Sequence, residues 1–193
     1  MSVRPDDLVA RRLRESAATA AALEPLVGAI DAAGAALVGC YRDGGKAILF
    51  GNGGSAAQAA HLAAELVGRY LRDRPPLPAL SLLDNHSAVT AIGNDYGFES
   101  SFSRQVEAHA APGDVMIGMT TSGRSPNVVA ALQAGRAAGA ATIGLAGRSG
   151  HDLAAAADHL LLVPSDDVPR IQEAHLVIGH TLCEIVEQAL FPE

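Results

Sequence analysis

The 193-residue chain has no tryptophan, and aromatic residues make up only 4% of it. Its core must therefore consist mainly of Ala, Leu, Val and Ile, with helices and strands packed closely. Basic residues are also scarce, because 14 Lys and Arg stand against 21 Asp and Glu, a net charge of −7. A general nucleic-acid-binding protein needs a basic surface, so this balance argues against that class. A small anionic ligand is compatible with it, because backbone N–H groups of a loop hold a phosphate without net positive charge.

Cysteines and long apolar runs are equally scarce. Cys40 and Cys183 lie far apart and form no CxxC motif, which disfavours a disulfide framework and favours the reducing cytoplasm. Residues 1–14 are too highly charged for a secretory signal peptide. Every apolar run of about 18 residues is interrupted by charged or polar groups, so no membrane span is expected. With 49% hydrophobic residues, we expect a cytoplasmic protein with one compact domain over residues 1–193.

The sequence does contain a regular alternation of helical and strand patterns. The first forty residues carry apolar side chains at helical spacings of three and four, a stripe that packs against its own domain or in a helical bundle shared between subunits. The last helix is apolar almost all round, which predicts that it is buried. The segments expected after residue 43 are strands 46–50, 79–83, 115–119, 141–145 and 159–163, and helices 56–70, 128–138 and 171–190.

This alternation predicts an α/β fold in which helices wrap a five-stranded parallel sheet. An N-terminal helical segment, 1–43, would precede the α/β sandwich, 44–193. Ligands of such sheets bind at the carboxyl ends of the strands. Three of those ends carry loops rich in Gly and Ser, which makes them candidate binding sites.

The first of these loops, Gly51-Asn-Gly-Gly-Ser-Ala56, joins a predicted strand to a helix. Glycines allow a sharp turn and a close approach of a ligand, and free N–H groups at a helix N-terminus favour an anion. The loop also satisfies a loosened dinucleotide fingerprint, G-x-G-x-x-A, with Asp84 just after the second strand. A nicotinamide-dependent oxidoreductase is therefore one alternative.

The second loop, Thr120-Thr-Ser-Gly-Arg-Ser125, carries more hydroxyls than one helix cap requires. Ser125 stands at an N-cap position, and Pro126 stands at the favoured first helical position. Four hydroxyls beside a helix N-terminus suit a phosphate monoester, which offers several acceptor oxygens. A dinucleotide enzyme needs no second loop of this kind, and without a P-loop lysine a nucleoside triphosphate is disfavoured.

Two helical patterns each place a histidine and a glutamate on one face. His61 and Glu65 are four residues apart, within reach of a common metal or substrate, although such pairs are also frequent as ordinary surface pairs. His180 and Glu184 repeat the spacing in the last helix. Gln172 lies eight residues before His180, about 12 Å along a helix axis. These two could share one metal only by leaning toward each other or by coming from neighbouring subunits.

A further polar segment, Asn94-Asp-Tyr-Gly97, has the composition of a turn. Asn and Asp favour turns because their side chains hydrogen-bond to nearby backbone. The segment is either an ordinary turn or a polar contact to a polyol, and its residues alone do not separate the two.

Taken together, these motifs resemble one family, the sedoheptulose 7-phosphate (phosphoheptose) isomerases of the sugar-isomerase (SIS) domain superfamily. The resemblance covers nearly the whole chain in order and rests on Gly51–Ala56, His61 with Glu65, Asn94-Asp95, Thr120–Ser125, and Arg170-Ile-Gln-Glu-x-His175 through His180. It implies a flavodoxin-like three-layer sandwich with N-terminal helices. It also implies a homotetramer with active sites between subunits and one zinc ion per subunit.

The resemblance implies roles for individual residues as well. The metal ligands would be His61, Glu65, Gln172 and His180. The acid–base pair would be Glu65 and His180. The substrate-binding residues would be Asn52, Gly53, Gly54, Ser55, Glu65, Asn94, Asp95, Thr120, Thr121, Ser122, Ser125 and Gln172.

The implied reaction converts sedoheptulose 7-phosphate into D-glycero-D-manno-heptose 7-phosphate through an enediol, in nucleotide-activated heptose biosynthesis. The expected partner is thus a small sugar phosphate, with no nucleic acid and no membrane. The alternative is a non-catalytic SIS-domain phosphosugar-binding regulator or a replication-initiator-associating protein, a relative that loses part of the metal set. This chain keeps all four metal positions. It departs from some members at Pro169, where they carry an acid, although Asp166 and Asp167 lie nearby.

Overall fold

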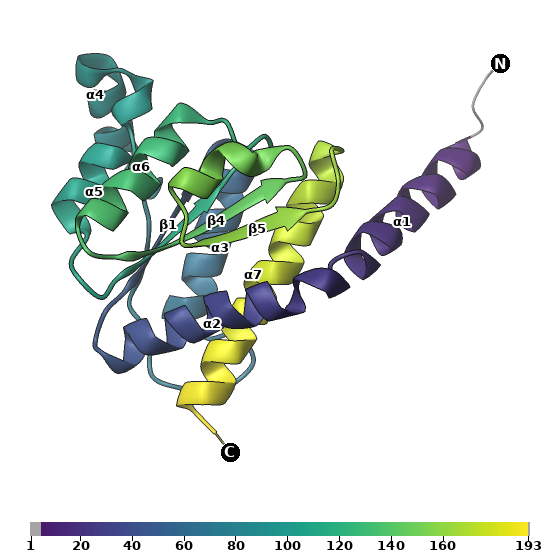
Figure 1. Ribbon diagram of the computed structural model, residues 1–193, viewed down its shortest axis with the longest axis horizontal. Coiled ribbons are helices and arrows are strands. Elements are labelled where there is room, and N and C mark those ends of the chain that lie inside the picture. The colour runs from purple at the N-terminus through teal and green to yellow at the C-terminus, as the bar shows by residue number, and fades with distance from the viewer. Residues whose placement is uncertain (1–4, 193) are drawn as a thin grey trace.

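The computed structural model describes residues 5–192, and one parallel β-sheet forms its centre (Figure 1). In chain order the strands are β1 (Ala47–Gly51), β2 (Ala79–Ser81), β3 (Val115–Met119), β4 (Ala141–Gly147) and β5 (His159–Val163). They lie side by side in the order β2-β1-β3-β4-β5, and each neighbouring pair is parallel. Helices cover both faces, so the predicted three-layer α/β sandwich is confirmed.

Each face of the sheet has its own apolar core. The helices on one face are α2 (Val27–Arg42), α3 (Gly54–Val67) and α7 (Val168–Leu190). Those on the other are α5 (Ser103–His109), α6 (Pro126–Ala137) and the short helix η3 (Gly150–Ala155), with α4 (His86–Tyr96) and η2 (Phe98–Ser100) beside α5 and α6 (Figure 1). Because both faces are covered, every residue of β1 and β3 is buried, which explains their uninterrupted apolar sequences.

The strand order fixes where a ligand can enter. β1 pairs with β2 on one side and with β3 on the other, so the chain changes direction across the sheet between β1 and β3. In open parallel sheets a crevice forms at such a switch point, outside the carboxyl ends of the two strands. The loops that follow β1 and β3 are the two loops in which the sequence predicts anion binding.

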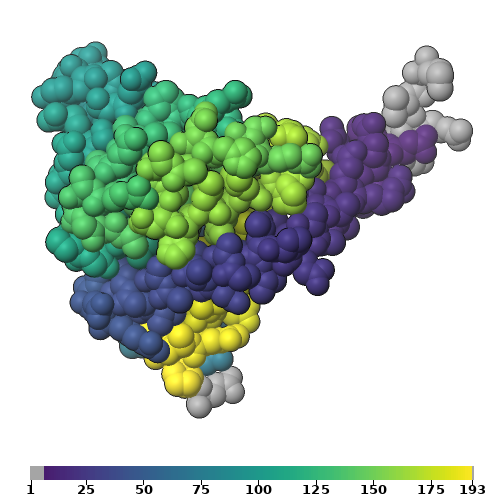
Figure 2. All heavy atoms as spheres, viewed as in Figure 1, coloured from purple at the N-terminus to yellow at the C-terminus, as the bar shows by residue number. Residues whose placement is uncertain are grey.

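The N-terminal helices divide into a core part and an exposed part. α2 packs along α7, with Ile30 and Leu37 buried. Before it, α1 (Pro5–Ala21) and the short helix η1 (Glu24–Leu26) extend from the body (Figures 1 and 2), and α1 exposes Leu8, Val9 and Leu13. The stretch Asp7–Arg42 is long and apolar enough to cross a membrane by length and composition alone. Core helices of globular proteins meet the same test, and α2 is such a helix.

Several predicted details differ in the structure, among them the end of the helix predicted over 56–70, which stops at Val67. β2 ends at Ser81 rather than at residue 83, because the backbone turns there and the N–H of Asp84 donates to the Ser81 carbonyl. α7 is not buried all round, since it packs by one side only and leaves Val177 46% exposed. The expected turn at 94–97 is the last turn of α4, and only Gly97, with φ of 87°, leaves the helix.

Candidate active site

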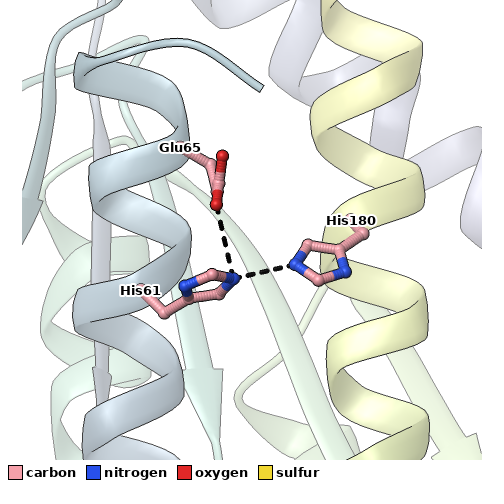
Figure 3. A group of neighbouring side chains, drawn as sticks. All are labelled: His61, Glu65 and His180. Carbon is pink, nitrogen blue, oxygen red and sulfur yellow. Dashed lines mark hydrogen bonds and ion pairs between the residues drawn. The ribbon is translucent and has the colours of Figure 1, made fainter. Parts of the chain in front are cut away.

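Three side chains converge between α3 and α7. His61 and Glu65 lie on α3, His180 lies on α7, and their ligand atoms all lie within 4.8 Å of one another (Figure 3). The Nε2 atoms of His61 and His180 are 2.8 Å apart, a hydrogen bond in which the tautomer decides the donor. The Nε2 of His61 is 3.5 Å from Oε1 of Glu65. His61 and Glu65, which the sequence pairs by their four-residue spacing on α3, are thus joined by His180 from a distant part of the chain.

A close approach of the two helices brings these groups together. Leu62 and Gly179 are the chain neighbours of His61 and His180. A Cβ atom added to Gly179 would lie 2.4 Å from Cδ1 of Leu62, well inside contact distance. Because residue 179 has no side chain, α3 and α7 approach closely enough for the two imidazoles to meet.

The cluster fits a zinc ion by donor type and by spacing. Two imidazole nitrogens and a carboxylate oxygen are the ligands typical of zinc sites. With bonds of about 2.0–2.1 Å, neighbouring ligand atoms around a tetrahedral zinc lie about 3.3–3.4 Å apart. The observed separations of 2.8 Å and 3.5 Å fall on either side of that value.

The structure decides two questions that the helical spacing left open, namely whether Glu184 and whether Gln172 lie beside His180. Glu184, four residues after His180, lies outside the cluster, and its Oε1 accepts a hydrogen bond from Nε2 of Gln188. Gln172 lies two turns before His180, and its amide packs against Gly54, where an added Cβ would be 2.3 Å from Nε2. Its backbone carbonyl accepts from Gln58 Nε2 at 2.6 Å. Within one protomer, Gln172 therefore belongs to a different pocket from His180.

That pocket lies at the carboxyl ends of β1 and β3 and has a cavity volume of about 100 Å³. All its lining residues are uncharged: Asn52, Ser55, Thr120, Thr121, Ser122, Ser125 and Gln172. Every one of them is a sequence-predicted substrate residue. Backbone N–H groups and the first turns of α3 and α6 face this end of the sheet, so the local dipoles favour an anion.

Three hydroxyls of this pocket, those of Thr120, Ser122 and Ser125, bond to one another rather than to the backbone of α6. Ser125 occupies the N-cap position of α6, but its side chain makes no capping hydrogen bond within the described residues. Its Oγ lies 2.9 Å from Oγ1 of Thr120, which in turn is 3.5 Å from Oγ of Ser122. These hydroxyls can rotate toward a bound acceptor, so the functional interpretation of Ser125 is favoured over plain capping.

The β1–α3 loop is shaped by its glycines and by one asparagine pair. Gly53 has φ of 56°, a left-handed conformation that favours glycine. The side chain of Asn52 is held by reciprocal amide hydrogen bonds with Asn127, at 2.8 Å and 2.9 Å. Asn127 is buried and also donates to Ser101 Oγ at 3.3 Å. This arrangement fixes the position of Asn52 at the mouth of the pocket.

Asn94 and Asp95 are not brought to either group. They end α4, in the layer on the opposite face of the sheet from His61 and His180, and both are exposed. Nδ2 of Asn94 donates to Oδ1 of Asp95 at 2.7 Å. The helix that carries them, α4, lies apart from α3 and α7 (Figure 1).

The acids near Pro169 have partners of their own. Pro169 lies in the first turn of α7, where its missing N–H has no cost. Asp167 accepts from Nη1 of Arg12 at 2.8 Å, and Asp166 accepts from Oγ of Ser149 at 3.0 Å. Asp166 also lines a second pocket, shared with Thr121 and Ser122. Of the two acids near Pro169, Asp166 is therefore the one that lies beside the loop Thr120–Ser125.

Comparison with known proteins matches this arrangement to one family. A family model described as the SIS domain matches residues 13–147. A phosphoheptose isomerase of Trichlorobacter lovleyi is 53% identical over 155 residues, which cover 80% of this chain and 79% of that protein. The chain belongs to the phosphoheptose isomerase family.

Solved structures of family members have the same architecture. The phosphoheptose isomerase GmhA from Neisseria gonorrhoeae superposes with a TM-score of 0.90 at 39% identity, over 96% of this chain and 100% of that one. The phosphoheptose isomerase from Francisella tularensis gives a TM-score of 0.85 at 37% identity, over 95% and 96% of the two chains. The family fold thus includes the N-terminal helices as well as the sandwich.

Two residues at the site carry no signal in the sequence of this family member. Tyr70 stacks on His180, with ring centroids 5.3 Å apart, yet in the sequence it is only the last residue of the helix predicted over 56–70, and in the structure it lies beyond the end of α3 at Val67. Burial raises the pKa of Tyr70. Asn127 reads as an ordinary residue of a helical first turn. Only contacts between distant segments reveal either role, and such contacts leave no local pattern.

His175 is a buried histidine that the site geometry does not use. Its side chain is fully buried, and neither ring nitrogen has a hydrogen-bond partner within the described residues. Burial lowers the pKa of His175 to about 4, because a charged ring would be desolvated there. It is therefore neutral at physiological pH.

Proposed function

We propose that this protein is an aldose–ketose isomerase that converts sedoheptulose 7-phosphate into D-glycero-D-manno-heptose 7-phosphate, in nucleotide-activated heptose biosynthesis. The observation that carries the proposal is the convergence of His61, Glu65 and His180 on α3 and α7, the two helices that also contribute Ser55 and Gln172 to the hydroxyl pocket. Membership of the phosphoheptose isomerase family supports the substrate class.

The spacing of the two groups suits a long sugar phosphate. Ser55 lines the hydroxyl pocket, and His61 follows six residues later on α3, about 9 Å along the helix axis. Gln172 and His180 are similarly separated along α7. A substrate whose phosphate lies in the pocket can therefore place its far carbons at the histidine cluster. An extended seven-carbon chain phosphorylated at one end has this shape.

In the proposed mechanism Glu65 is the base and His180 is the acid. A base must carry a proton between carbons 1 and 2 through an enediol, while a second group handles the oxygen protons. Glu65 and His180 reach one point from two helices, as this division of labour requires. The phosphate supplies binding energy that holds the reacting end in place.

The remaining predicted contacts would hold the rest of the substrate. Hydroxyls of Thr120, Thr121, Ser122 and Ser125, with Ser55, would bind the phosphate, assisted by the N-terminus of α6. Asn52, Gly53 and Gly54 would contact the sugar beside Gln172. Asn94 and Asp95 would reach the sugar only in another protomer, since they lie apart from the pocket in this one.

We propose zinc as the cofactor, one ion per subunit, held by His61, Glu65 and His180 with Gln172 as the fourth ligand. A bound zinc ion would supply Lewis-acid polarisation of the substrate carbonyl. Gln172 joins the other three only from a neighbouring protomer or after α7 bends toward it, because two helical turns separate it from His180. A carboxylate that ligates a metal is a weaker base, so if Glu65 served mainly as a zinc ligand, His180 would do more of the proton transfer.

We also propose a homotetramer with active sites between subunits, which the same placement supports. Leu8, Val9 and Leu13 on α1 are exposed apolar residues that a second protomer could cover. A groove between the start of α2 and α7 is lined by further exposed apolar groups, among them Val27 and Val177. We place the protein in the cytoplasm, with a sugar phosphate as partner and without nucleic acid or membrane.

The test is carbon NMR of sedoheptulose 7-phosphate incubated with the purified protein, as isolated, after chelation, and after zinc is returned. We expect the anomeric signal of an aldoheptose 7-phosphate, lost on chelation and restored by zinc. A signal that persists after chelation would keep the isomerase and remove the metal assignment. Binding of the sugar without any conversion would instead indicate a phosphosugar-binding regulator.

A further inference from the structure

The imidazole of His180 lies between two other rings. Tyr70 stacks against it with centroids 5.3 Å apart and an angle of 21° between the planes. His61 meets it edge-on, with centroids 5.1 Å apart and an angle of 71°. His61 contacts Nε2 of His180, whereas Tyr70 covers a face of the His180 ring. The face contact limits rotation of the imidazole about its bond to Cβ, and so fixes where Nε2 points.

Tyr70 owes its position to one buried carboxylate. It lies in the irregular segment between α3 and β2, where regular backbone pairing does not hold it. Glu187, on α7 and 1% exposed, accepts hydrogen bonds from the backbone N–H groups of Tyr70, Leu71 and Arg72 at 2.9, 2.9 and 3.0 Å. Three consecutive N–H groups on one carboxylate fix the backbone of this segment relative to α7, which also carries His180.

A buried arginine extends this anchor to α3. Nε of Arg74 donates to Oε1 of Glu187 at 2.9 Å, and the side chains of both residues are almost fully buried. The same guanidinium donates to the carbonyls of Leu66 and Glu65, each at 2.8 Å. Arg74 thus satisfies the last turn of α3 at the residue whose side chain enters the cluster. Buried ion pairs add little net stability, because desolvation offsets their attraction, so a positional role accounts for this one better.

We propose that Tyr70 is a positioning residue for His180, and that the Glu187–Arg74 pair holds Tyr70 in place. The inference rests on the proposed function, in that His180 is taken as a ligand and acid. The ring of Tyr70, and not its hydroxyl, does the positioning, because the contact to His180 is made face to face. The anchor ties His180, Tyr70 and the backbone of Glu65 into one unit.

The first arm of the test needs neither substrate nor metal. In the metal-free protein, we expect a nuclear Overhauser contact between ring protons of Tyr70 and His180, with the His180 signal assigned as the one missing in His180→Gln. The His180 signal should keep its position in Tyr70→Phe and move downfield in Tyr70→Leu, which removes the ring current. Absence of the contact in the wild-type protein overturns the proposal even if a variant fails to fold.

The second arm measures zinc affinity, by competition with a chromophoric chelator, and steady-state isomerisation. We expect Tyr70→Leu to weaken zinc binding and lower kcat about tenfold each, with KM within about twofold, the size seen when support of a metal ligand is lost. Tyr70→Phe should match the wild type. The matched control is Leu71→Ala, the next side chain, which is exposed and shares the backbone anchor. Equal losses in Tyr70→Phe, or in Leu71→Ala, would overturn the proposal.

The third arm tests the anchor by a double-mutant cycle. Glu187→Gln keeps the shape of the side chain and removes its charge, so the segment should loosen and kcat should fall in the same direction as in Tyr70→Leu. If Glu187 acts through Tyr70, the double variant is no slower than Tyr70→Leu alone. Additive losses would overturn the role given to Glu187. If the wild-type protein shows no isomerisation, the proposed function fails, whereas the Overhauser contact and zinc affinity still decide the role of Tyr70.

Discussion

The two ends of the sheet carry different polar chemistry. At the amino ends, Asp114 accepts hydrogen bonds from the backbone N–H of Lys46 at 2.9 Å and from that of Ala111 at 2.8 Å, and pairs with Lys46 Nζ at 2.6 Å. Asp158 likewise accepts from the N–H and hydroxyl of Thr142. At the carboxyl ends, neutral hydroxyls and amides bond to one another.

The difference teaches how the fold separates stability from binding. A carboxylate that accepts several N–H groups is already satisfied and holds strands together. Rotatable hydroxyls such as those of Thr120 and Ser125, which bond to each other, can still donate to an incoming phosphate. We therefore expect substitutions at the amino ends to lower the free energy of unfolding and those at the carboxyl ends to impair substrate turnover or binding.

The largest effect is expected from Glu65→Gln, which keeps the shape of the side chain but removes the base. Turnover should fall about 10³-fold, the usual contribution of a general base. Carbon NMR rates and bound zinc are measured together. Glu184→Gln, the same change on α7 outside the cluster, should leave the rate within about twofold. A Glu65→Gln variant that retains zinc and near-normal turnover would show that another group is the base.

His175 is an exception to this division between the two ends of the sheet. It lies near the carboxyl end of β4, yet we expect it to affect the free energy of unfolding. Its folded-state pKa of about 4 lies below the unfolded value of about 6.5, so between these values the unfolded chain binds more protons. The free energy of unfolding should therefore be highest above pH 6.5 and fall by roughly 3 kcal/mol as the pH drops to 4.

Denaturant unfolding at pH 7 and pH 5 measures the part of this loss that occurs above pH 5, roughly 2 kcal/mol. His175→Leu should make it smaller, since no ring is left to protonate. His151→Gln, at an exposed histidine, should leave it unchanged. An equal loss of stability in His175→Leu and the wild type would assign the pH dependence to other groups.

Asp114→Asn should lower the free energy of unfolding by about 2 kcal/mol, because a buried carboxylate loses its charge-assisted hydrogen bonds. The value lies at the low end for a buried pair, since Lys46 is 27% exposed and can be resolvated. Thermal unfolding measures it, and kcat should not change. Asp152→Asn, at an exposed acid, serves as the control. Impaired turnover at unchanged stability would contradict the division between the two ends.

The smallest effect is a paired one. Thr120→Val removes a hydroxyl at the carboxyl end and should raise KM about tenfold with little change in kcat, as expected for one hydrogen bond to a charged phosphate. Thr142→Val makes the same change at the amino end and should lower the melting temperature instead. Reversed outcomes for the two threonines would refute the comparison most directly.

The sequence predicts most of the fold because a parallel sheet covered on both faces leaves short apolar runs. β3 and β5 match their predicted residues 115–119 and 159–163, and β1 is displaced by one residue. The hydroxyl pocket was equally predictable, since strand ends of a parallel sheet meet at one edge.

The rest of the site depends on contacts that a local pattern does not record. Spacing finds Glu65 with His61 but pairs His180 with Glu184, because the neighbour of His180 belongs to another helix. The positions of Gln172, Asn94 and Asp95 relative to the cluster could not be deduced, since they depend on how helices pack and, in the proposed tetramer, on how subunits pack. Tyr70 follows only from the anchor on Glu187, which is 117 residues away in the chain.

Gly179 has a consequence for how such sequences diverge. It carries no chemistry, yet its missing side chain sets the approach of α3 to α7, so it cannot change independently of Leu62. A lineage could keep both histidines and the glutamate and still separate them by acquiring a larger residue at position 179. Classifying family members as enzymes or inactive relatives from their reactive residues alone would then give wrong assignments. The residues at positions 62 and 179 indicate in addition whether the reactive residues can still meet.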